Sequence, residues 1–446
     1  MLHKNIQRYP TLYEGVFERA NSLNFLRLIL ASCVIFSHTP YLVMGAKVDE
    51  HPLVHNFYVF GDYAVNAFFC ISGFLIAHSA YRSGAGSYLV KRVLRIFPGY
   101  WVSILFVVAL GGPISVITGH AATGWDWADA LHYIRSNYDL MALQYPLFGG
   151  PIDVPLEFPS WNGSVWSLEY EFFCYLLLLP LFYLPLIRKN LKIFIPLAYL
   201  ISLSYYLCNQ YLGYDFMSQA FGLHPRDLNA SARMYPLFFA GSLLYLLSRK
   251  IRVYPVLSVL CVAAGVYITW LVPHANVLQW TQLILAYGII GLGCSINVSW
   301  ARTNDISYGV YVYAWPVQQI LVMLGSVSLG LAANIFLDLI LTFGVAGLSW
   351  MFIEKPAMNL ARHPIVTGSK RRESSPPPTH STSDTPASQA DEPATAQIPH
   401  PLGHPIQFSK KRQGAAMISR PFSIRISGFR LVRYSQPAFP VKPRPH

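Results

Sequence analysis

The chain has 446 residues, of which 53% are hydrophobic, 15% aromatic and only 12% charged. This balance is typical of a polytopic membrane protein and excludes an ordinary soluble domain. The formal net charge of +12 does not indicate a nucleic-acid partner, because +8 of it falls in the polar segment from Lys370 to His446.

Ten apolar segments are candidate membrane spans. They cover residues 23–44, 57–80, 98–118, 164–187, 193–211, 233–248, 254–272, 278–296, 306–327 and 331–353. We therefore expect an all-α fold, a polytopic transmembrane bundle of about ten spans. No cleavable signal peptide is expected, because the first twenty residues are polar and no small-residue cleavage site follows the first span.

Basic residues gather in the connections that follow the even-numbered spans. These connections are Tyr81–Arg95, Arg188–Lys192, Arg249–Arg252, Arg302 and the stretch after Glu354. Because cytoplasmic loops carry an excess of lysine and arginine, we expect both termini to lie in the cytoplasm.

The composition changes after Arg362 to serine, proline, threonine and alanine. Such a segment cannot bury enough apolar surface to fold. We therefore expect three parts: a cytoplasmic N-terminal segment, 1–22, a transmembrane domain, 23–356, and a disordered basic tail, 357–446. The six cysteines all fall in apolar segments without CxxC spacing, which favours buried, reduced thiols over a metal site or disulfides.

Arg27 and His38 lie eleven residues apart inside the first apolar segment. Eleven helical steps make three turns plus about 20°, so both side chains project from nearly the same face, roughly 16 Å apart along the axis. Ionisable groups inside a span usually face a protein interior or a water-filled cavity. A snorkelling cation and a structural histidine explain the pair as well as a general base does.

A basic segment, Lys91-Arg92-Val-Leu-Arg95, precedes the third span. Arg92 and Arg95 are three residues apart and share a face if the segment is helical. Two guanidinium groups side by side match the oxygens of a phosphate. Basic residues before a span also set membrane orientation, so both interpretations stand.

Two carboxylates lie at the start of the fourth span. Glu169 and Glu171 point about 200° apart around a helix, so at most one of them faces the same cavity as His38. The helix dipole also favours carboxylates at this position, which is a purely structural explanation. In the second span, Ser72 lies among bulky residues, where close helix packing is the favoured interpretation.

Six ordered segments together resemble the integral-membrane acyltransferase-3 family, which includes O-acetyltransferases of bacterial lipopolysaccharide and other surface glycans. They are NFLRLILASCVIFSH, DYAVNAFFCISGFLI, KRVLRIFPGYW, WSLEYEFFCY, ISYGVYVYAWPV and FIEKP, from about Leu23 to Pro356. The resemblance implies a multi-pass acyltransferase of the bacterial cytoplasmic (inner) membrane.

The family's motif of an arginine and a histidine separated by ten residues falls on Arg27 and His38. The resemblance implies that Arg27 orients the donor or stabilises oxyanion charge and that His38 deprotonates the acceptor hydroxyl. The family's Arg-x-x-Arg motif, linked to the coenzyme A donor, falls on Arg92 and Arg95. With the adjacent Lys91, these residues are expected to hold the coenzyme's phosphates.

The glutamate of the family's Trp-Ser-Leu-x-x-Glu segment falls on Glu171, not on Glu169. By this resemblance, Glu171 orients His38 or binds the sugar. Many relatives carry a histidine before a late aromatic–Pro step, where this chain has Ala314. The implied catalytic residues are therefore Arg27, His38 and Glu171.

The leading hypothesis is transfer of an acyl group, acetyl in the first instance, from cytosolic acyl-CoA to a hydroxyl of an extracytoplasmic or lipid-linked glycan. It requires no permanently bound cofactor, no metal and no nucleic acid; acetyl-CoA is a co-substrate, and lipids surround the protein. A transporter or flippase with a buried Arg/His relay fits the same spans physically, although no repeat relates the two halves. A non-catalytic membrane scaffold whose tail binds partners is the third hypothesis.

Overall fold

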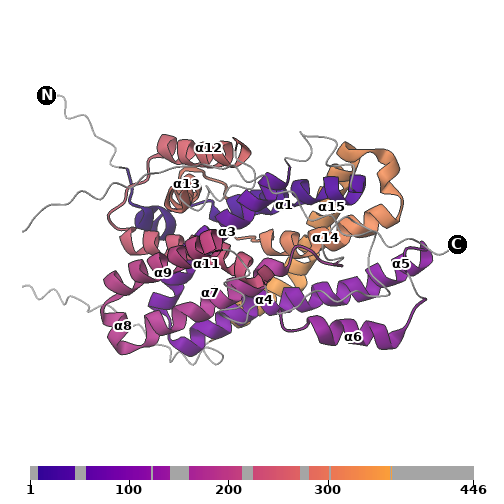
Figure 1. Ribbon diagram of the computed structural model, residues 1–446, viewed down its shortest axis with the longest axis horizontal. Coiled ribbons are helices and arrows are strands. Elements are labelled where there is room, and N and C mark those ends of the chain that lie inside the picture. Colours follow the sequence, from indigo (N-terminus) through magenta and orange to yellow (C-terminus); the bar gives the residue numbers. More distant parts are fainter. Residues whose placement is uncertain are drawn as a thin grey trace, which may run out of the picture. The chain divides into compact units, whose positions relative to one another are not determined.

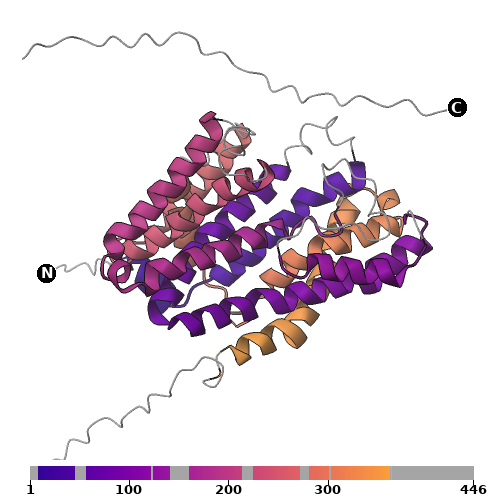
Figure 2. The same ribbon diagram turned by 60° about the horizontal axis from the view of Figure 1, so that its bottom comes forward.

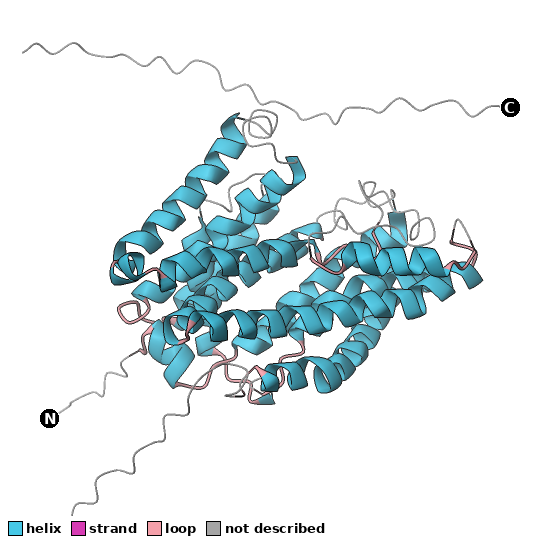
Figure 3. Ribbon diagram, turned by 90° about the horizontal axis from the view of Figure 1, so that it is seen from below, coloured by secondary structure: helices cyan, strands magenta, loops and turns pink. Residues whose placement is uncertain are grey.

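The computed structural model describes residues 9–45, 57–121, 124–140, 160–212, 225–271, 281–300, 303–361 and 363. Over these residues the fold is all-α, as predicted, with helices and loops but no β-strand (Figure 3). An isolated backbone bridge pairs Thr11 with Arg252. Most of the predicted tail, 357–446, lies outside the described residues.

Each predicted span overlaps a helix. In chain order the helices are η1 (Glu14–Glu18), α1 (Leu23–Met44), α3 (Tyr58–Arg82), α4 (Ala85–Phe106), η3 (Val107–Gly111), α5 (Gly112–Ile117), α6 (Trp127–Asn137), α7 (Trp166–Tyr183), α8 (Pro185–Lys189), α9 (Leu191–Leu212), α11 (Pro225–Leu247), α12 (Pro255–Leu271), α13 (Gln282–Ser295), α14 (Ser307–Met323), η6 (Ser326–Leu329), α15 (Leu331–Ser349), η7 (Trp350–Glu354) and α16 (Lys355–Leu360). A helix satisfies its own backbone groups, which is what a chain in lipid requires.

Among the described residues, five helices are long and apolar enough to cross a membrane, judged by length and composition. They are Leu23–Met44, Val59–Arg82, Ala85–Ile117, Leu191–Tyr211 and Leu331–Leu360. These helices make the chain a membrane protein. The count of about ten spans and the cytoplasmic placement of both termini stay predictions.

The basic segment from Lys91 to Arg95 is not a loop, and in this respect the sequence-based expectation was wrong. Helix α3 ends at Arg82 and α4 begins at Ala85, so the segment lies within the first half of α4. The helix continues through the π-helical turn η3 into α5, which gives one helix of 33 residues, Ala85–Ile117. Arg92 and Arg95 therefore do share one helix face.

Helix α3 occupies the middle of the described bundle, where it packs against α1 on one side and α11 on another (Figures 1 and 2). Two glycines allow the backbones of α3 and α11 to touch. A Cβ on Gly73 would overlap the carbonyl oxygen of Phe238, and one on Gly241 would overlap the carbonyl oxygen of Cys70. Small residues at a helix crossing permit such close approach, which maximises van der Waals contact.

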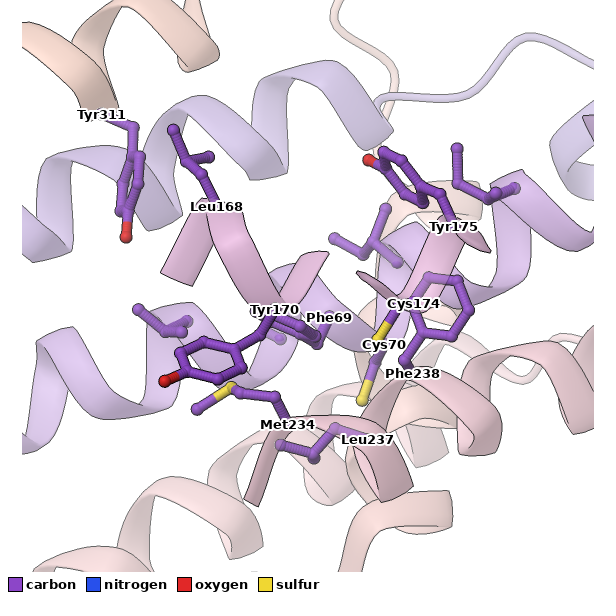
Figure 4. Close-up of a cluster of buried hydrophobic side chains, with 14 of the residues drawn as sticks. Phe69, Cys70, Leu168, Tyr170, Cys174, Tyr175, Met234, Leu237, Phe238 and Tyr311 are labelled. Atoms are coloured by element: carbon purple, nitrogen blue, oxygen red, sulfur yellow. The ribbon is translucent and has the colours of Figure 1, made fainter. Parts of the chain in front are cut away.

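Beside this crossing, α7 contributes to a buried cluster with α3 and α11. Figure 4 shows Cys70 of α3, Cys174 of α7 and Phe238 of α11 meeting in its centre. All three side chains are completely buried. The cysteines are free thiols, and they fill space as small apolar residues do. The cluster fixes the position of α7 on α3, and it thereby positions the cavity described below.

Replacing Gly73 by alanine is expected to destabilise the protein by about 2 kcal/mol or more, because the new methyl group meets backbone that cannot move aside. Gly344 of α15 is the matched control, since an added Cβ there has nothing within 4 Å. Thermal unfolding in detergent should show a lowered midpoint for Gly73→Ala and an unchanged or raised midpoint for Gly344→Ala. Equal midpoints would contradict the close α3–α11 contact.

Candidate active site

A cavity of about 200 Å³ opens among α1, α3, α4, α7 and α14. One wall is apolar and comes mostly from α3, where Phe68, Phe69 and Leu75 line it. Most of the polar groups come from the other helices, although Ser72 and Ser79 belong to α3. The polar lining consists of Arg27, Ser72, Ser79, Arg92, Arg95, Ser167, Glu171, Tyr175, Ser307, Tyr308 and Tyr311. Four of the six predicted site residues therefore line this one cavity: Arg27, Arg92, Arg95 and Glu171.

Asp305, in the loop before α14, joins two of the arginines. Its Oδ2 accepts a hydrogen bond from Arg27 Nη1 at 2.6 Å and another from Arg95 Nη2 at 2.7 Å. Its Oδ1 accepts a third from the Ser307 hydroxyl at 2.6 Å. The Asp305 side chain is only 11% exposed, so these are short, charge-assisted bonds shielded from water. The carboxylate fixes Arg27 of α1 against Arg95 of α4.

Burial alone would raise the pKa of the Asp305 carboxyl, but the charges of Arg27 and Arg95 and the hydrogen bond from Ser307 outweigh burial. Together they lower the pKa from 3.8 to about 2. Asp305 is therefore ionised throughout the physiological range.

A carboxyl whose pKa is lowered in the folded state adds stability above its unfolded pKa and loses it as the pH falls. We expect the contribution of Asp305, roughly 2 kcal/mol, to be constant from pH 7 to about pH 4 and to vanish towards pH 2. Thermal midpoints of the wild type and of Asp305→Asn, measured across this range, should converge only below pH 4. A gap that already closes between pH 7 and pH 5 would contradict the lowered pKa.

Glu171 projects into the cavity from the first turns of α7. Its Oε1 accepts hydrogen bonds from the Ser72 hydroxyl at 2.8 Å and from the Tyr175 hydroxyl at 2.5 Å. The bond from Ser72 pairs α7 with α3, and the bond from Tyr175 lies within α7. The carboxylate is therefore held by two hydroxyl groups, and it lines the same cavity as the arginines.

Arg92 is the arginine of the cavity whose charge is least engaged. Its guanidinium lies over the ring of Tyr175, with the Cζ atom 5.7 Å from the ring centroid. Its Nε is buried and, among the described residues, has no hydrogen-bond acceptor. A cavity-lining guanidinium with an unmatched donor is suited to an anionic ligand.

His38 lies outside this cavity, three turns farther along α1 than Arg27. Its ring meets the ring of Trp315 of α14 edge to face, with the centroids 4.6 Å apart. Its Nδ1 is buried and has no hydrogen-bond partner within the described part of the chain. The indole of Trp315 is in turn anchored by a 3.0 Å bond from Nε1 to the carbonyl oxygen of Ser160. The histidine is thus held in place by packing rather than by a polar network.

Two other positions singled out in the sequence lie away from the cavity. The Lys91 ammonium bonds the Ser83 hydroxyl at 3.3 Å and does not line the cavity. Ala314 is fully buried and packs with Ala31 and Ile35 of α1. A methyl group at this position lets α1 and α14 approach closely.

Sequence reasoning missed Asp305, Tyr175 and the polar role of Ser72. The signal for Asp305 was present, since it is an acidic residue directly before an apolar span in a chain with several arginines near other spans. Ser72 was interpreted as a packing residue, but it also donates to Glu171. No periodicity marks either role, because the partners come from helices distant in the sequence.

The chain was compared with known proteins. Residues 20–354 match a family profile described as an acyltransferase domain, that of the acyltransferase-3 family. The chain is 27% identical over 363 residues to a protein of Shigella phage Sf6 named O-acetyl transferase, with 76% of this chain and 96% of that protein covered. It is 28% identical over 373 residues to nodulation protein 10 of Rhizobium leguminosarum bv. viciae, with 76% and 94% covered.

No solved structure matches the chain. The family match covers well over half of the chain, from before α1 to the end of η7, and it includes every residue that lines the cavity. The chain therefore belongs to the acyltransferase-3 family, and it is a membrane acyltransferase.

Proposed function

We propose that the protein transfers an acetyl group from acetyl-CoA to a hydroxyl group of an extracytoplasmic or lipid-linked glycan in the bacterial cytoplasmic membrane. An acetyl group and an oxygen acceptor agree with the name of the phage relative, O-acetyl transferase. The observation that carries the proposal is the convergence of Arg27, Arg92 and Arg95 on one cavity that also contains apolar surface. Acetyl-CoA is complementary to such a cavity, because its phosphates are anionic and its pantetheine arm carries methyl and methylene groups between its amides.

On the donor side, Arg92 and Arg95 would bind the phosphates of the coenzyme. Arg95 is already fixed by Asp305, so it loses little freedom when a ligand arrives. Arg92 has an unmatched donor, which a phosphate oxygen would satisfy. The apolar wall formed by Phe68, Phe69 and Leu75 would contact the pantetheine arm.

On the acceptor side, His38 would remove the proton from the hydroxyl as its oxygen attacks the thioester carbonyl carbon. Negative charge then develops on the carbonyl oxygen. Arg27 lines the cavity about three turns of α1 away from His38, so its role would be to orient the donor. The carbon–sulfur bond breaks, the ester remains on the acceptor, and the proton on His38 returns to the coenzyme thiolate. Glu171 would bind a hydroxyl or amide group of either substrate.

The donor site is tested by replacing Arg92 with glutamine. We expect the KM for acetyl-CoA to rise at least about tenfold, because a hydrogen bond between charged groups contributes roughly 1.5–3 kcal/mol. The assay supplies inverted membrane vesicles with acetyl-CoA labelled on the acyl group and follows label into glycan. Arg135→Gln, an exposed arginine of α6, is the matched control and should leave the KM unchanged. Unaltered kinetics in Arg92→Gln would remove the phosphate-binding role.

The glycan acceptor is tested in the same vesicles. Label should enter saccharide material as an ester, which mild alkali releases as acetate. Label that enters only protein or phospholipid would contradict the glycan acceptor, and the absence of any transfer from acetyl-CoA would contradict the donor.

A further inference from the structure

A second cavity, of about 610 Å³, lies among α3, α9 and α11 and the segment that leads into η1. Three cations line it: Arg82 at the end of α3, Lys192 in the first turn of α9 and Arg249 after α11. Among its described lining residues there is no aspartate or glutamate. None of the three cations forms an ion pair within the described residues. The cavity therefore concentrates positive charge that the protein itself does not neutralise.

Aromatic rings line the same cavity, and several are already fixed in place. The guanidinium of Arg249 lies over the ring of Tyr13, with its Cζ 3.8 Å from the centroid. The ring of His78 stacks on Phe17 at 3.8 Å, and Tyr245 meets it edge to face at 5.5 Å. The Nδ1 of His78 is buried without a hydrogen-bond partner in the described part of the chain.

The wall that carries Tyr13 is held by backbone hydrogen bonds and not by side chains alone. The amide of Leu12 donates to the carbonyl oxygen of Ile251 at 2.8 Å, and that of Tyr13 donates to Ser248 at 3.1 Å. The amide of Val253 donates to Pro10 at 2.8 Å. These bonds tie the N-terminal segment to the turn after α11, so the cavity is formed without a ligand.

Charge and shape together indicate the chemistry of the ligand. Unpaired cations select an anion, and arginine in particular selects phosphate. Aromatic side chains stack on planar heterocycles, and cations beside the rings strengthen the contact. A volume of this size exceeds what an isolated phosphate ion fills. A phosphorylated purine nucleoside is anionic, carries a planar heterocycle and is larger than a phosphate ion.

The second cavity lies beyond the first along helices α3 and α7. Leu75 and Arg82 of α3 are seven residues apart, and so are Tyr175 and Phe182 of α7. In each pair the first residue lines the first cavity and the second lines the second cavity. Seven helical steps bring a side chain back to within about 20° of the same face and advance it by roughly 10 Å. The two cavities thus lie one after the other along the same faces of two neighbouring helices.

We propose that this basic aromatic cavity binds the 3′-phosphorylated nucleoside of the acyl donor, while the diphosphate and the acyl-bearing arm extend into the cavity lined by Arg92, Arg95 and Glu171. The inference rests on the proposed function, because it assumes a coenzyme A thioester as donor. It adds a site for the 3′-phosphoadenosine group. Arg249 and Lys192 bind the 3′-phosphate, Arg92 and Arg95 keep the diphosphate, and Tyr13 and Tyr245 bound the space for the base.

The experiment compares two donors on the full-length protein in nanodiscs. Acetyl-CoA carries the nucleotide, whereas S-acetyl-4′-phosphopantetheine lacks it. For Arg249→Gln we expect the KM for acetyl-CoA to rise about tenfold, which corresponds to about 1.4 kcal/mol, while the KM for the truncated donor is unchanged. Lys250→Gln, which alters a neighbouring exposed cation outside the cavity, should leave both constants at the wild-type value. A rise of the same size with both donors would overturn the proposal.

A binding measurement separates this proposal from the proposed function. Adenosine 3′,5′-bisphosphate should bind the wild type in nanodiscs of neutral lipid and bind Arg249→Gln about tenfold more weakly, whether or not acyl transfer is detected. No binding to the wild type, or equal binding to the two proteins, would overturn the nucleotide site. Binding that disappears in neutral lipid while phosphatidylglycerol stabilises only the wild type would assign the cavity to an anionic lipid headgroup and would also overturn it.

Discussion

Replacing His38 by glutamine is expected to lower kcat for acyl transfer by about 10² to 10⁴-fold, the usual contribution of a general base. Glutamine keeps much of the size of the imidazole but cannot accept a proton near neutral pH. The buried Nδ1 has no partner in the described part of the chain, so the substitution breaks no hydrogen bond there. Labelled acetyl transfer in membrane vesicles measures the effect, and the KM for acetyl-CoA should stay near the wild-type value.

His120 provides the matched control, because it is exposed near the end of α5 and only its Nδ1 contacts the Thr118 hydroxyl, at 2.9 Å. His120→Gln should retain full activity. A thermal midpoint of His38→Gln close to that of the wild type would show that lost activity reflects chemistry and not misfolding. If His38→Gln retains more than half of the wild-type kcat, His38 is a packing partner of Trp315 and the base must be sought elsewhere.

Replacing Asp305 by asparagine is expected to cost roughly 2 kcal/mol of stability at neutral pH, the same contribution that protonation of the carboxyl removes at low pH. The mutation removes the carboxylate that bonds both Arg27 and Arg95, and both side chains are at most 20% exposed. Their repulsion should also displace Arg95 and raise the KM for acetyl-CoA. The two readouts are the thermal midpoint in detergent and the kinetics of transfer.

The exposed ion pair between Asp62 and Arg233 is the control. Its nitrogen–oxygen distance is 3.0 Å, but the Asp62 side chain is 44% exposed, and such pairs contribute about 0–1 kcal/mol. Asp62→Asn should therefore shift the midpoint only slightly. Equal shifts in the two mutants would show that Asp305 does not hold the two arginines as a buried clamp.

The sequence predicted the helices well, because apolar runs of about twenty residues leave a membrane chain few alternatives to helix. It failed at the segment from Lys91 to Arg95, which was assigned to a loop on account of its charges. The segment belongs to a helix, and one face of that helix lines the polar cavity. Its arginines are therefore accommodated inside the protein and not in a solvated loop. The small helix α6, in the connection between the third and fourth predicted spans, was missed although Asp126 caps its first turn and Trp127, Ala130 and Ile134 recur at helical spacing.

For the site, sequence motifs selected residues but not their neighbours. Arg27, Arg92, Arg95 and Glu171 do line one cavity, and the spacing of Arg92 and Arg95 correctly indicated a shared helix face. Their roles stay predictions. The bonds from Arg27 and Arg95 to Asp305 span 278 and 210 residues, and no local pattern encodes such distances. Which side chains meet across helices depends on how closely the helices pack, and this packing is set by contacts such as that of Gly73 with the backbone of Phe238.

The position of Asp305 has a consequence for biosynthesis. Arg27 and Arg95 leave the ribosome more than two hundred residues before the carboxylate that neutralises them. During that interval both cations enter the membrane region without this counter-charge, at a cost of several kcal/mol in lipid. The nascent bundle therefore gains much of its stability late, when the segment before α14 inserts. Truncated chains that end before residue 305 lack this carboxylate, so they should be unstable and degraded even though most of their helices are complete.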